Sequence, residues 1–326
     1  MKKEITRRDF IVETIGAGFA ISGVGALTAC NEKDARGLPT TVLGKTGVRV
    51  PLMALGLGSR FCEIDDPEES DQILNYALDN GLYYWDTAHI YENNKNGVIS
   101  EERIGRIVKY RRKEIFLSTK VTSRDPNEAM MQIEKSLRRL QTDHLDILKI
   151  HNIRDMNDVD KVSEKGNLVD IIQRMKEEGI CRFIGFSGHM DAEAMIAMAE
   201  RFDLDTMLIA LNHWGKVRFP REEKSLPMVR SKGLGVMVMK VLRPRDSDPS
   251  ISPKELIRYG LSLKAAHGAV VGIDSMKVLQ ENIKLLKSFE PMTSEEMKTM
   301  TVCLDPFFHH NNMPWMTPGY CDGNWA

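Results

Sequence analysis

Four side chains that suit proton transfer lie at or just beyond the ends of apolar runs. Asp86 follows the run "YYW", and Tyr91 lies five residues later in "DTAHIY". Lys120 closes "IFLSTK" and His151 closes "LDILKIH". Alone, an Asp in such a place is usually a helix N-cap, a Tyr packs half-buried, and a His is a hydrogen-bonded structural residue. Their occurrence at three successive apolar runs instead predicts one shared site.

The chemistry that suits this set is reduction of a carbonyl group. Hydride addition to a carbonyl carbon creates an alkoxide, which needs a proton from a positioned acid. A phenol with its ordinary pKa of about 10 is too weak an acid unless a cation favours the phenolate. We expect Lys120 to supply that cation, Asp86 to hold Lys120 charged and oriented, and Tyr91 to donate the proton. His151 would donate to the carbonyl oxygen and help to position the substrate.

The elements that must position these residues alternate regularly along the chain. Eight strands are predicted near residues 51–57, 82–86, 115–120, 145–150, 182–186, 206–210, 235–239 and 269–272. Amphipathic segments with helical spacing separate them, and a hairpin is predicted around "GKTG" ahead of the first strand. Parallel strands joined by crossover helices bury both faces. We therefore predict an α/β fold, a (β/α)8 TIM barrel with an N-terminal β-hairpin, whose chemistry lies at the carboxyl ends of the strands.

The N-terminus has the layout of an export signal. A basic segment, "MKKEITRRDF", precedes about twenty apolar or small residues that end at Cys30. The pair Arg7 and Arg8 resembles a twin-arginine signal, the route for folded proteins, and "LTAC" resembles a lipobox that makes Cys30 the lipidated residue. An uncleaved anchor helix is the alternative, but Glu13 and the small residues make the segment weakly apolar. We expect a periplasmic or cell-envelope lipoprotein that meets the membrane only through this lipid.

Four regions follow from this organisation. We predict an export signal with a lipobox at 1–30, a linker at 31–39, the barrel at 40–290 and a C-terminal tail at 291–326. The tail is rich in aromatic residues, Met and His. It either covers the barrel mouth, where Trp315 and Tyr320 would line a substrate pocket, or packs on the barrel exterior.

Composition limits the classes of partner. Lys and Arg number 45 against 46 Asp and Glu, a formal net charge of -1, so a basic surface for nucleic acid is not expected. After Cys30, four cysteines remain with no CxxC spacing, and no metal site is expected. A disulfide between Cys303 and Cys321 is disfavoured. The expected partner is a small molecule.

Several motifs resemble those of the aldo-keto reductases, in family order, between residues 40 and 288. The segments concerned are "LGKTGVRVPLMALGLG", "DTAHIY", "SEERIG", "STK" and "KIH". The resemblance implies that Tyr91 is the general acid/base and that Asp86, Lys120 and His151 complete a catalytic tetrad. It also implies a nicotinamide cofactor, NADP or NAD, bound without a Rossmann fold.

Among the positions that bind the cofactor in this family, some match in this sequence and others differ. "GFSGH" is similar to the carboxamide-binding segment, with Ser187 matching and with Gly188 and His189 where many members have Asn and an apolar or aromatic residue. Leu208 stands where a Gln is common. The resemblance leaves His189 or Asn212 to replace that lost hydrogen bond.

The nucleotide end of the cofactor has candidates of its own. "MKVLRP" resembles the loop that faces the pyrophosphate, which makes Lys240 and Arg243 candidate phosphate contacts; solvated loop cations are the alternative. "QEN" matches the adenine-side residues, here Glu281 and Asn282. Basic residues that often hold the 2'-phosphate of NADP are replaced by Gly272 and Val278, and Lys277 is the nearby cation. Both NADP and NAD therefore remain candidates.

The sequence thus predicts an oxidoreductase that uses NADPH or NADH to interconvert a small carbonyl compound and its alcohol. An alternative is an exported nucleotide-binding sensor or regulatory subunit with little turnover, similar to the channel-associated members of the family. A barrel hydrolase acting on sugars would need paired carboxylates at strand ends. Asp86 has no evident carboxylate partner in the sequence, which disfavours that third class.

Overall fold

The computed structural model of the protein describes residues 32–189, 191–210, 225–243 and 250–304. The predicted signal with Cys30, the cofactor candidate Asn212, and the tail residues Trp315, Tyr320 and Cys321 lie outside the described residues.

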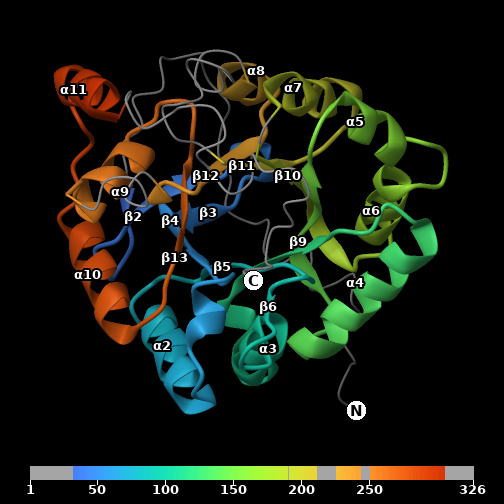
Figure 1. Ribbon diagram of the computed structural model, residues 1–326, viewed down its shortest axis with the longest axis horizontal. Coiled ribbons are helices and arrows are strands. Elements are labelled where there is room, and N and C mark those ends of the chain that lie inside the picture. Colours follow the sequence, from blue (N-terminus) through green and yellow to red (C-terminus); the bar gives the residue numbers. More distant parts are fainter. Residues whose placement is uncertain (1–31, 190, 211–224, 244–249, 305–326) are drawn as a thin grey trace, which may run out of the picture. The chain divides into compact units, whose positions relative to one another are not determined.

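Eight parallel strands close into a barrel (Figure 1), in the spatial order in which they follow one another along the chain. They are β4 (Met53–Gly56), β5 (Tyr84–Asp86), β8 (Phe116–Val121), β9 (Leu145–Ile153), β10 (Cys181–Gly188), β11 (Thr206–Ala210), β12 (Gly235–Met239) and β13 (Gly268–Gly272). Each overlaps one of the eight predicted strands. The barrel prediction is therefore confirmed, and the last strand closes back onto the first.

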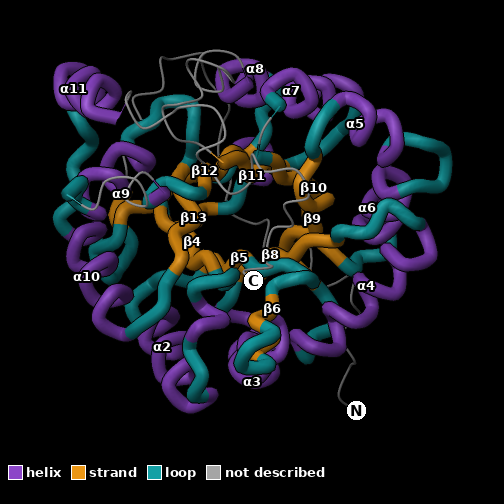
Figure 2. The backbone as a smooth tube through the Cα atoms, in the orientation of Figure 1, coloured by secondary structure: helices purple, strands orange, loops and turns teal. Residues whose placement is uncertain are grey.

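Helices surround this barrel, as the purple ring outside the orange strands in Figure 2 shows. They are α2 (Pro67–Asp79), α3 (Ser100–Arg111), α4 (Pro126–Leu140), α5 (Met156–Val162), α6 (Leu168–Glu177), α7 (Ala192–Arg201), α8 (Leu226–Ser231), α9 (Pro253–Leu261), α10 (Met276–Lys287) and α11 (Ser294–Leu304). Aspartates start several of them. The side chains of Asp66, Asp125 and Asp191 each accept a backbone N–H of the first turn, and Pro67 and Pro126 occupy first-turn positions that need no donor.

The N-terminal hairpin closes one end of the barrel. Strands β2 (Pro39–Val42) and β3 (Arg49–Pro51) pair in antiparallel fashion around the short helix η1 (Gly44–Thr46). The backbone N–H of Lys45 donates to the carbonyl of Gly233 just before β12, at 2.6 Å. A Cβ on Gly44 would lie 2.4 Å from the backbone nitrogen of Gly235, so only glycine permits this close approach.

An apolar layer fills the barrel interior above the hairpin. It joins Leu43 and Val50 of the hairpin to inward-facing residues of the strands, including Tyr84, Phe116 and Leu208. This layer separates the hairpin end from the polar side chains at the carboxyl ends of the strands. Those polar side chains are therefore bounded on the hairpin side by apolar residues.

Several elements go beyond the sequence prediction, among them helix α5, which follows β9 directly. Strand β1 (Glu32–Lys33) lies in the expected linker and pairs with β2. A two-stranded ribbon, β6 (Glu92–Asn93) with β7 (Val98–Ile99), follows Tyr91 directly. The expected tail begins with helix α11, which the sequence analysis did not predict. Its weak amphipathic pattern gives little signal against the strong pattern of α10.

Candidate active site

Three neighbouring strands carry the predicted proton-transfer residues. Asp86 is the last residue of β5, Lys120 lies one residue before the end of β8, and His151 lies in β9, which continues to Ile153. Strand β5 pairs with β8, and β8 pairs with β9. Tyr91 lies in the loop between β5 and β6. The four residues are thus brought to one end of the barrel.

Asp86, Lys120 and Tyr91 form a continuous chain of contacts. The Nζ atom of Lys120 donates to Oδ2 of Asp86 at 2.6 Å and lies 3.3 Å from the hydroxyl of Tyr91. The same ammonium donates to the backbone carbonyl of Thr87 at 2.7 Å and lies 4.7 Å from the centre of the Tyr91 ring. Tyr91 is 8% exposed, so its hydroxyl faces the lysine in a nearly dry setting. This is the arrangement that favours a phenolate.

His151 packs beside the tyrosine. The two ring centres are 5.7 Å apart with an interplanar angle of 83°, an edge-to-face contact. Thr122 places its hydroxyl 3.3 Å from Nδ1 of His151. Arg124 donates to the backbone carbonyl of His151 at 2.9 Å and pairs with Asp158 at 2.6 Å, so the strand end is fixed.

The loop that carries Tyr91 is also fixed. The backbone N–H of Ser100, the first residue of "SEERIG", donates to the carbonyl of Tyr91 at 3.0 Å. The Ser100 hydroxyl lies 2.8 Å from that of Thr87. A Cβ on Gly58 would lie 3.2 Å from the Tyr91 ring, so the ring rests against bare backbone there. These contacts limit the positions open to the phenol.

Asp86 is a buried carboxylate held by two cations. Burial by itself would raise the pKa of Asp86, but the ammonium groups of Lys120 and Lys149 outweigh burial and hold the pKa below its usual value. Lys149 donates to Oδ1 of Asp86 at 2.7 Å, while Lys120 donates to Oδ2. Asp86 therefore stays ionised at neutral pH and binds two lysines rather than one.

Lys149 is a site residue that the sequence analysis missed. It lies two positions before His151 on the same strand, and side chains two apart on a strand face the same side. The motif "KIH" therefore contained the signal. The same spacing places Tyr84 two positions before Asp86 and Ser118 two before Lys120. Both of these missed residues contact Lys149.

The first cofactor candidates lie on the next strand. Ser187 is buried near the end of β10, and its Oγ accepts from the backbone N–H of Asn152 at 3.0 Å. Nδ1 of His189 lies 2.8 Å from Oδ1 of Asn152. Asn152 directly follows His151 and adopts a left-handed backbone with φ of 56°. It thus joins the predicted tetrad to the predicted cofactor side.

The two departures from the family pattern on this side have different surroundings. A Cβ on Gly188 would lie 2.4 Å from Cε of Met195 and 2.9 Å from the backbone carbonyl oxygen of Ile153, so a side chain there would displace the Met195 methyl group and crowd the β9 backbone. Leu208 is fully buried on β11 and pairs in register with Ser187. A side chain at position 208 therefore lies on the strand next to the serine that matches the carboxamide-binding segment.

The remaining candidates lie at the ends of β12 and β13. Lys240 follows β12 with φ of 64°, and the backbone N–H of Arg243 donates to its carbonyl at 3.1 Å. On α10, Lys277 and Glu281 are exposed. Asn282 is 6% exposed, and its Nδ2 has no hydrogen-bond partner among the described residues. A buried amide without a partner suits a ligand that accepts a hydrogen bond, which fits the adenine side of a nucleotide.

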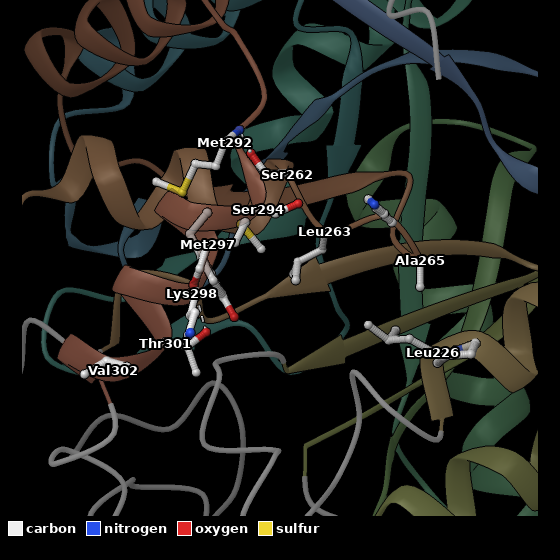
Figure 3. A pocket seen from close by; sticks show the side chains of 13 residues that line it. Leu226, Ser262, Leu263, Ala265, Met292, Ser294, Met297, Lys298, Thr301 and Val302 are labelled. Atoms are coloured by element: carbon white, nitrogen blue, oxygen red, sulfur yellow. Dashed lines mark hydrogen bonds between the residues drawn. The ribbon is translucent and has the colours of Figure 1, made fainter. Parts of the chain in front are cut away.

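A separate cavity of about 530 Å³ lies between α8, α9 and α11 (Figure 3). Met292, Met297 and Leu263 are among the side chains that line it, and no residue of the predicted tetrad does. In the described ranges, no group of three or more His, Cys, Asp or Glu could hold a metal ion. Burial raises the pKa of the Cys62 and Cys181 thiols to about 12, so both stay protonated.

Comparison with known proteins gives a consistent picture. A model described as "Aldo/keto reductase family" matches residues 53–244. The chain is 31% identical to the uncharacterized oxidoreductase YrpG of Bacillus subtilis over 216 residues, which are 60% of this chain and 64% of that protein. It is 25% identical to the L-galactose dehydrogenase of Arabidopsis thaliana over 318 residues, 84% of this chain and 95% of that enzyme.

Solved structures show the same fold. The holo form of an aldo-keto reductase from Bacillus halodurans superposes with a TM-score of 0.66 at 20% identity, covering 82% of this chain and 96% of that chain. At that identity, the similarity supports the barrel fold.

Proposed function

We propose, because the chain belongs to the aldo/keto reductase family, that it interconverts a small carbonyl compound and its alcohol with NADPH or NADH as the hydride carrier. The observation that carries this proposal is the buried chain of contacts from Asp86 through Lys120 to the Tyr91 hydroxyl. Carbonyl reduction needs an acid at the oxygen that becomes an alkoxide, and this chain of contacts provides one.

In the proposed reduction, a bound nicotinamide cofactor supplies the hydride. Tyr91 gives its hydroxyl proton to the substrate oxygen as negative charge develops there, and the Lys120 ammonium stabilises the phenolate that remains. His151, packed against the Tyr91 ring, donates to the same oxygen and holds the carbonyl in line. In the oxidation direction, the Tyr91 phenolate takes the alcohol proton.

The cofactor would lie along the ends of β10 to β13. Ser187, fixed by the backbone N–H of Asn152, would meet the carboxamide, with His189 beside it. Lys240 and Arg243 would face the pyrophosphate. The orphaned amide of Asn282 would meet the adenine side, next to Glu281 and Lys277.

A second candidate function rests on the altered carboxamide side. Gly188 and Leu208 offer no side-chain hydrogen bond to a carboxamide, which favours a barrel that binds nucleotide but turns over slowly, as a sensor or regulatory subunit. The contact between the Tyr91 hydroxyl and Lys120 favours the enzyme, because a sensor does not need a proton donor next to a cation.

The export signal remains part of the proposal. We propose that the twin-arginine-type segment exports the folded barrel and that Cys30 carries a lipid anchor. A route for folded proteins would carry the barrel out with its cofactor already bound. No described helix is long and apolar enough to cross a membrane. Membrane fractionation of the full chain and of Cys30→Ala tests this: the variant should move to the soluble fraction, and equal membrane retention would contradict the lipid anchor.

The test of the enzymatic proposal is a fluorescence titration of the purified chain with NADPH and NADH, followed by assay with a panel of aldehydes and ketones. We expect micromolar or tighter binding of at least one nucleotide and measurable oxidation of it by a carbonyl. Binding without turnover across the panel would favour the sensor. No binding of either nucleotide by folded, nucleotide-free protein would contradict both functions.

A further inference from the structure

A second lysine lies inside the barrel, behind the predicted tetrad. Lys149 is 1% exposed on β9. Its Nζ donates to Oδ1 of Asp86 at 2.7 Å, to Oγ of Ser118 at 2.7 Å and to the hydroxyl of Tyr84 at 3.4 Å. An ammonium has three N–H donors and no acceptor. Each of these three contacts is to an oxygen that accepts, which is the pattern of a charged lysine.

The two lysines share Asp86 evenly. Lys120 takes Oδ2 at 2.6 Å and reaches the hydroxyl of Tyr91, and Lys149 takes Oδ1 at 2.7 Å and reaches the hydroxyl of Tyr84. One carboxylate therefore joins two ammonium–phenol pairs. With Asp86 ionised, these three charged groups carry a net charge of one positive unit, in a space with little water.

The two phenols differ in their settings. Burial first, and then the negative charges of Asp86 and Asp146, hold the pKa of Tyr84 well above its usual value. Tyr84 thus stays a phenol and serves as an acceptor for Lys149. Asp146 is already paired with Arg112 at 2.9 Å and Arg182 at 2.7 Å on the outer side of the sheet.

The described groups that face Tyr91 come from several elements. They are Lys120 from β8, His151 and, through Asp86, Lys149 from β9, and the bare backbone of Gly58 from the turn after β4. Lys149 reaches Tyr91 through Asp86 and Lys120, so removing Lys149 keeps the contacts of Tyr91 with Lys120, His151 and Gly58.

We propose that Lys149 is a positioning residue that acts through Asp86 and Lys120 to favour the phenolate form of Tyr91, and so suits the site to alcohol oxidation near neutral pH. This rests on the proposed function for its chemical meaning. Without Lys149, Asp86 would neutralise Lys120 alone, and the pair would carry no net charge. With Lys149, one positive charge is left to stabilise the phenolate that takes the alcohol proton.

The first experiment needs no turnover. Protein labelled at tyrosine Cζ with ¹³C is titrated by NMR, and the Tyr91 signal is assigned by its loss in Tyr91→Phe. Removing one charge beyond hydrogen-bond distance should raise the Tyr91 titration midpoint by about one pH unit in Lys149→Met and in Lys149→Gln. Tyr84→Phe, which keeps the Lys149 charge, is the matched control and should leave the midpoint nearly unchanged. An unchanged midpoint in a folded Lys149 variant overturns the proposal.

A second measurement needs no substitution. In protein with ¹⁵N-labelled lysine, we expect two ammonium signals protected from solvent exchange at neutral pH, one each for Lys120 and Lys149. Only one such signal would overturn the proposal, because an uncharged Lys149 adds nothing to the field at Tyr91. This measurement decides the matter if the Lys149 variants do not fold.

Kinetics then separates an electrostatic role from a structural one. For oxidation of 4-nitrobenzyl alcohol with NADP⁺ or NAD⁺, the rise of kcat/KM with pH should move up by about one unit in Lys149→Met, an about tenfold loss at pH 7 that disappears at high pH. An equal loss at every pH would mean a packing defect and contradict the proposal. Absence of any turnover in the unsubstituted protein would contradict the proposed function, while the NMR midpoint would still test Lys149.

Discussion

The two halves of the barrel rim differ in how they carry polar groups. On the half formed by β5, β8 and β9, charged side chains contact one another directly, with Asp86 bound to Lys120 at 2.6 Å and to Lys149 at 2.7 Å. On the half formed by β10 to β13, Leu208 and Gly272 occupy positions where the resemblance to the family implies a polar or basic side chain for the proposed cofactor.

This difference shows which part of the proposed reaction the chain specifies most strongly. Proton delivery depends on a few side chains at fixed distances, and all of them are present and buried. Cofactor binding is spread over many contacts, including backbone groups, so the loss of one side chain costs affinity but not the reaction. Substitutions on the first half should therefore change the rate of chemistry, whereas substitutions on the second half should change binding.

The largest expected effect is that of Tyr91→Phe. It removes the proposed proton donor and keeps the ring that packs on His151, so the rate of carbonyl reduction should fall by roughly 10²-fold to 10⁴-fold. The dissociation constant for NADPH or NADH, measured by fluorescence titration, should change less than about twofold. Tyr110→Phe, at a position that is 78% exposed, is the control and should behave like the unsubstituted protein. Full turnover by Tyr91→Phe would remove Tyr91 from the mechanism.

A smaller effect is expected from Leu208→Gln, which returns an amide to the cofactor half. Because position 208 is fully buried beside Ser187, the new amide lacks water in the free protein, and its unmet hydrogen bonds should cost about 1–3 kcal/mol of stability. A bound carboxamide would satisfy them. We expect a lower thermal midpoint for the free variant and a larger rise of that midpoint on adding NADH.

Leu208→Met is the matched control for this change, since it keeps the volume and adds no amide. It should bind nucleotide like the unsubstituted protein. If Leu208→Gln is destabilised equally with and without nucleotide, the carboxamide does not reach position 208. Leu208 would then not account for the difference between the two halves of the barrel rim.

The sequence predicted the barrel well because each strand is a short apolar run between amphipathic helices, and this pattern depends on local spacing. It also predicted which strand ends bear Asp86, Lys120 and His151. It did not reveal Lys149, although strand periodicity places Lys149 on the same face as His151, because a lysine inside an apolar run has no ordinary interpretation until its partners are seen. The ion pair between Arg60 and Asp274, at 3.8 Å, was equally hidden, since it joins the turn after β4 to the segment after β13.

The smallest effect is expected from Gly272→Lys, which tests whether the cofactor half lacks only a cation for NADPH. A Cβ at Gly272 would lie 3.6 Å from the Arg60 side chain, an ordinary contact, so a side chain can begin there without moving the backbone. One partly exposed ion pair with the 2'-phosphate should tighten NADPH binding by about fivefold to tenfold and leave NADH binding unchanged. The gain should shrink as salt is added. Gly272→Met, with similar reach and no charge, should show no such gain. Equal tightening of both nucleotides would place the new lysine on the pyrophosphate instead and would mean that NADP preference is not decided at the end of β13.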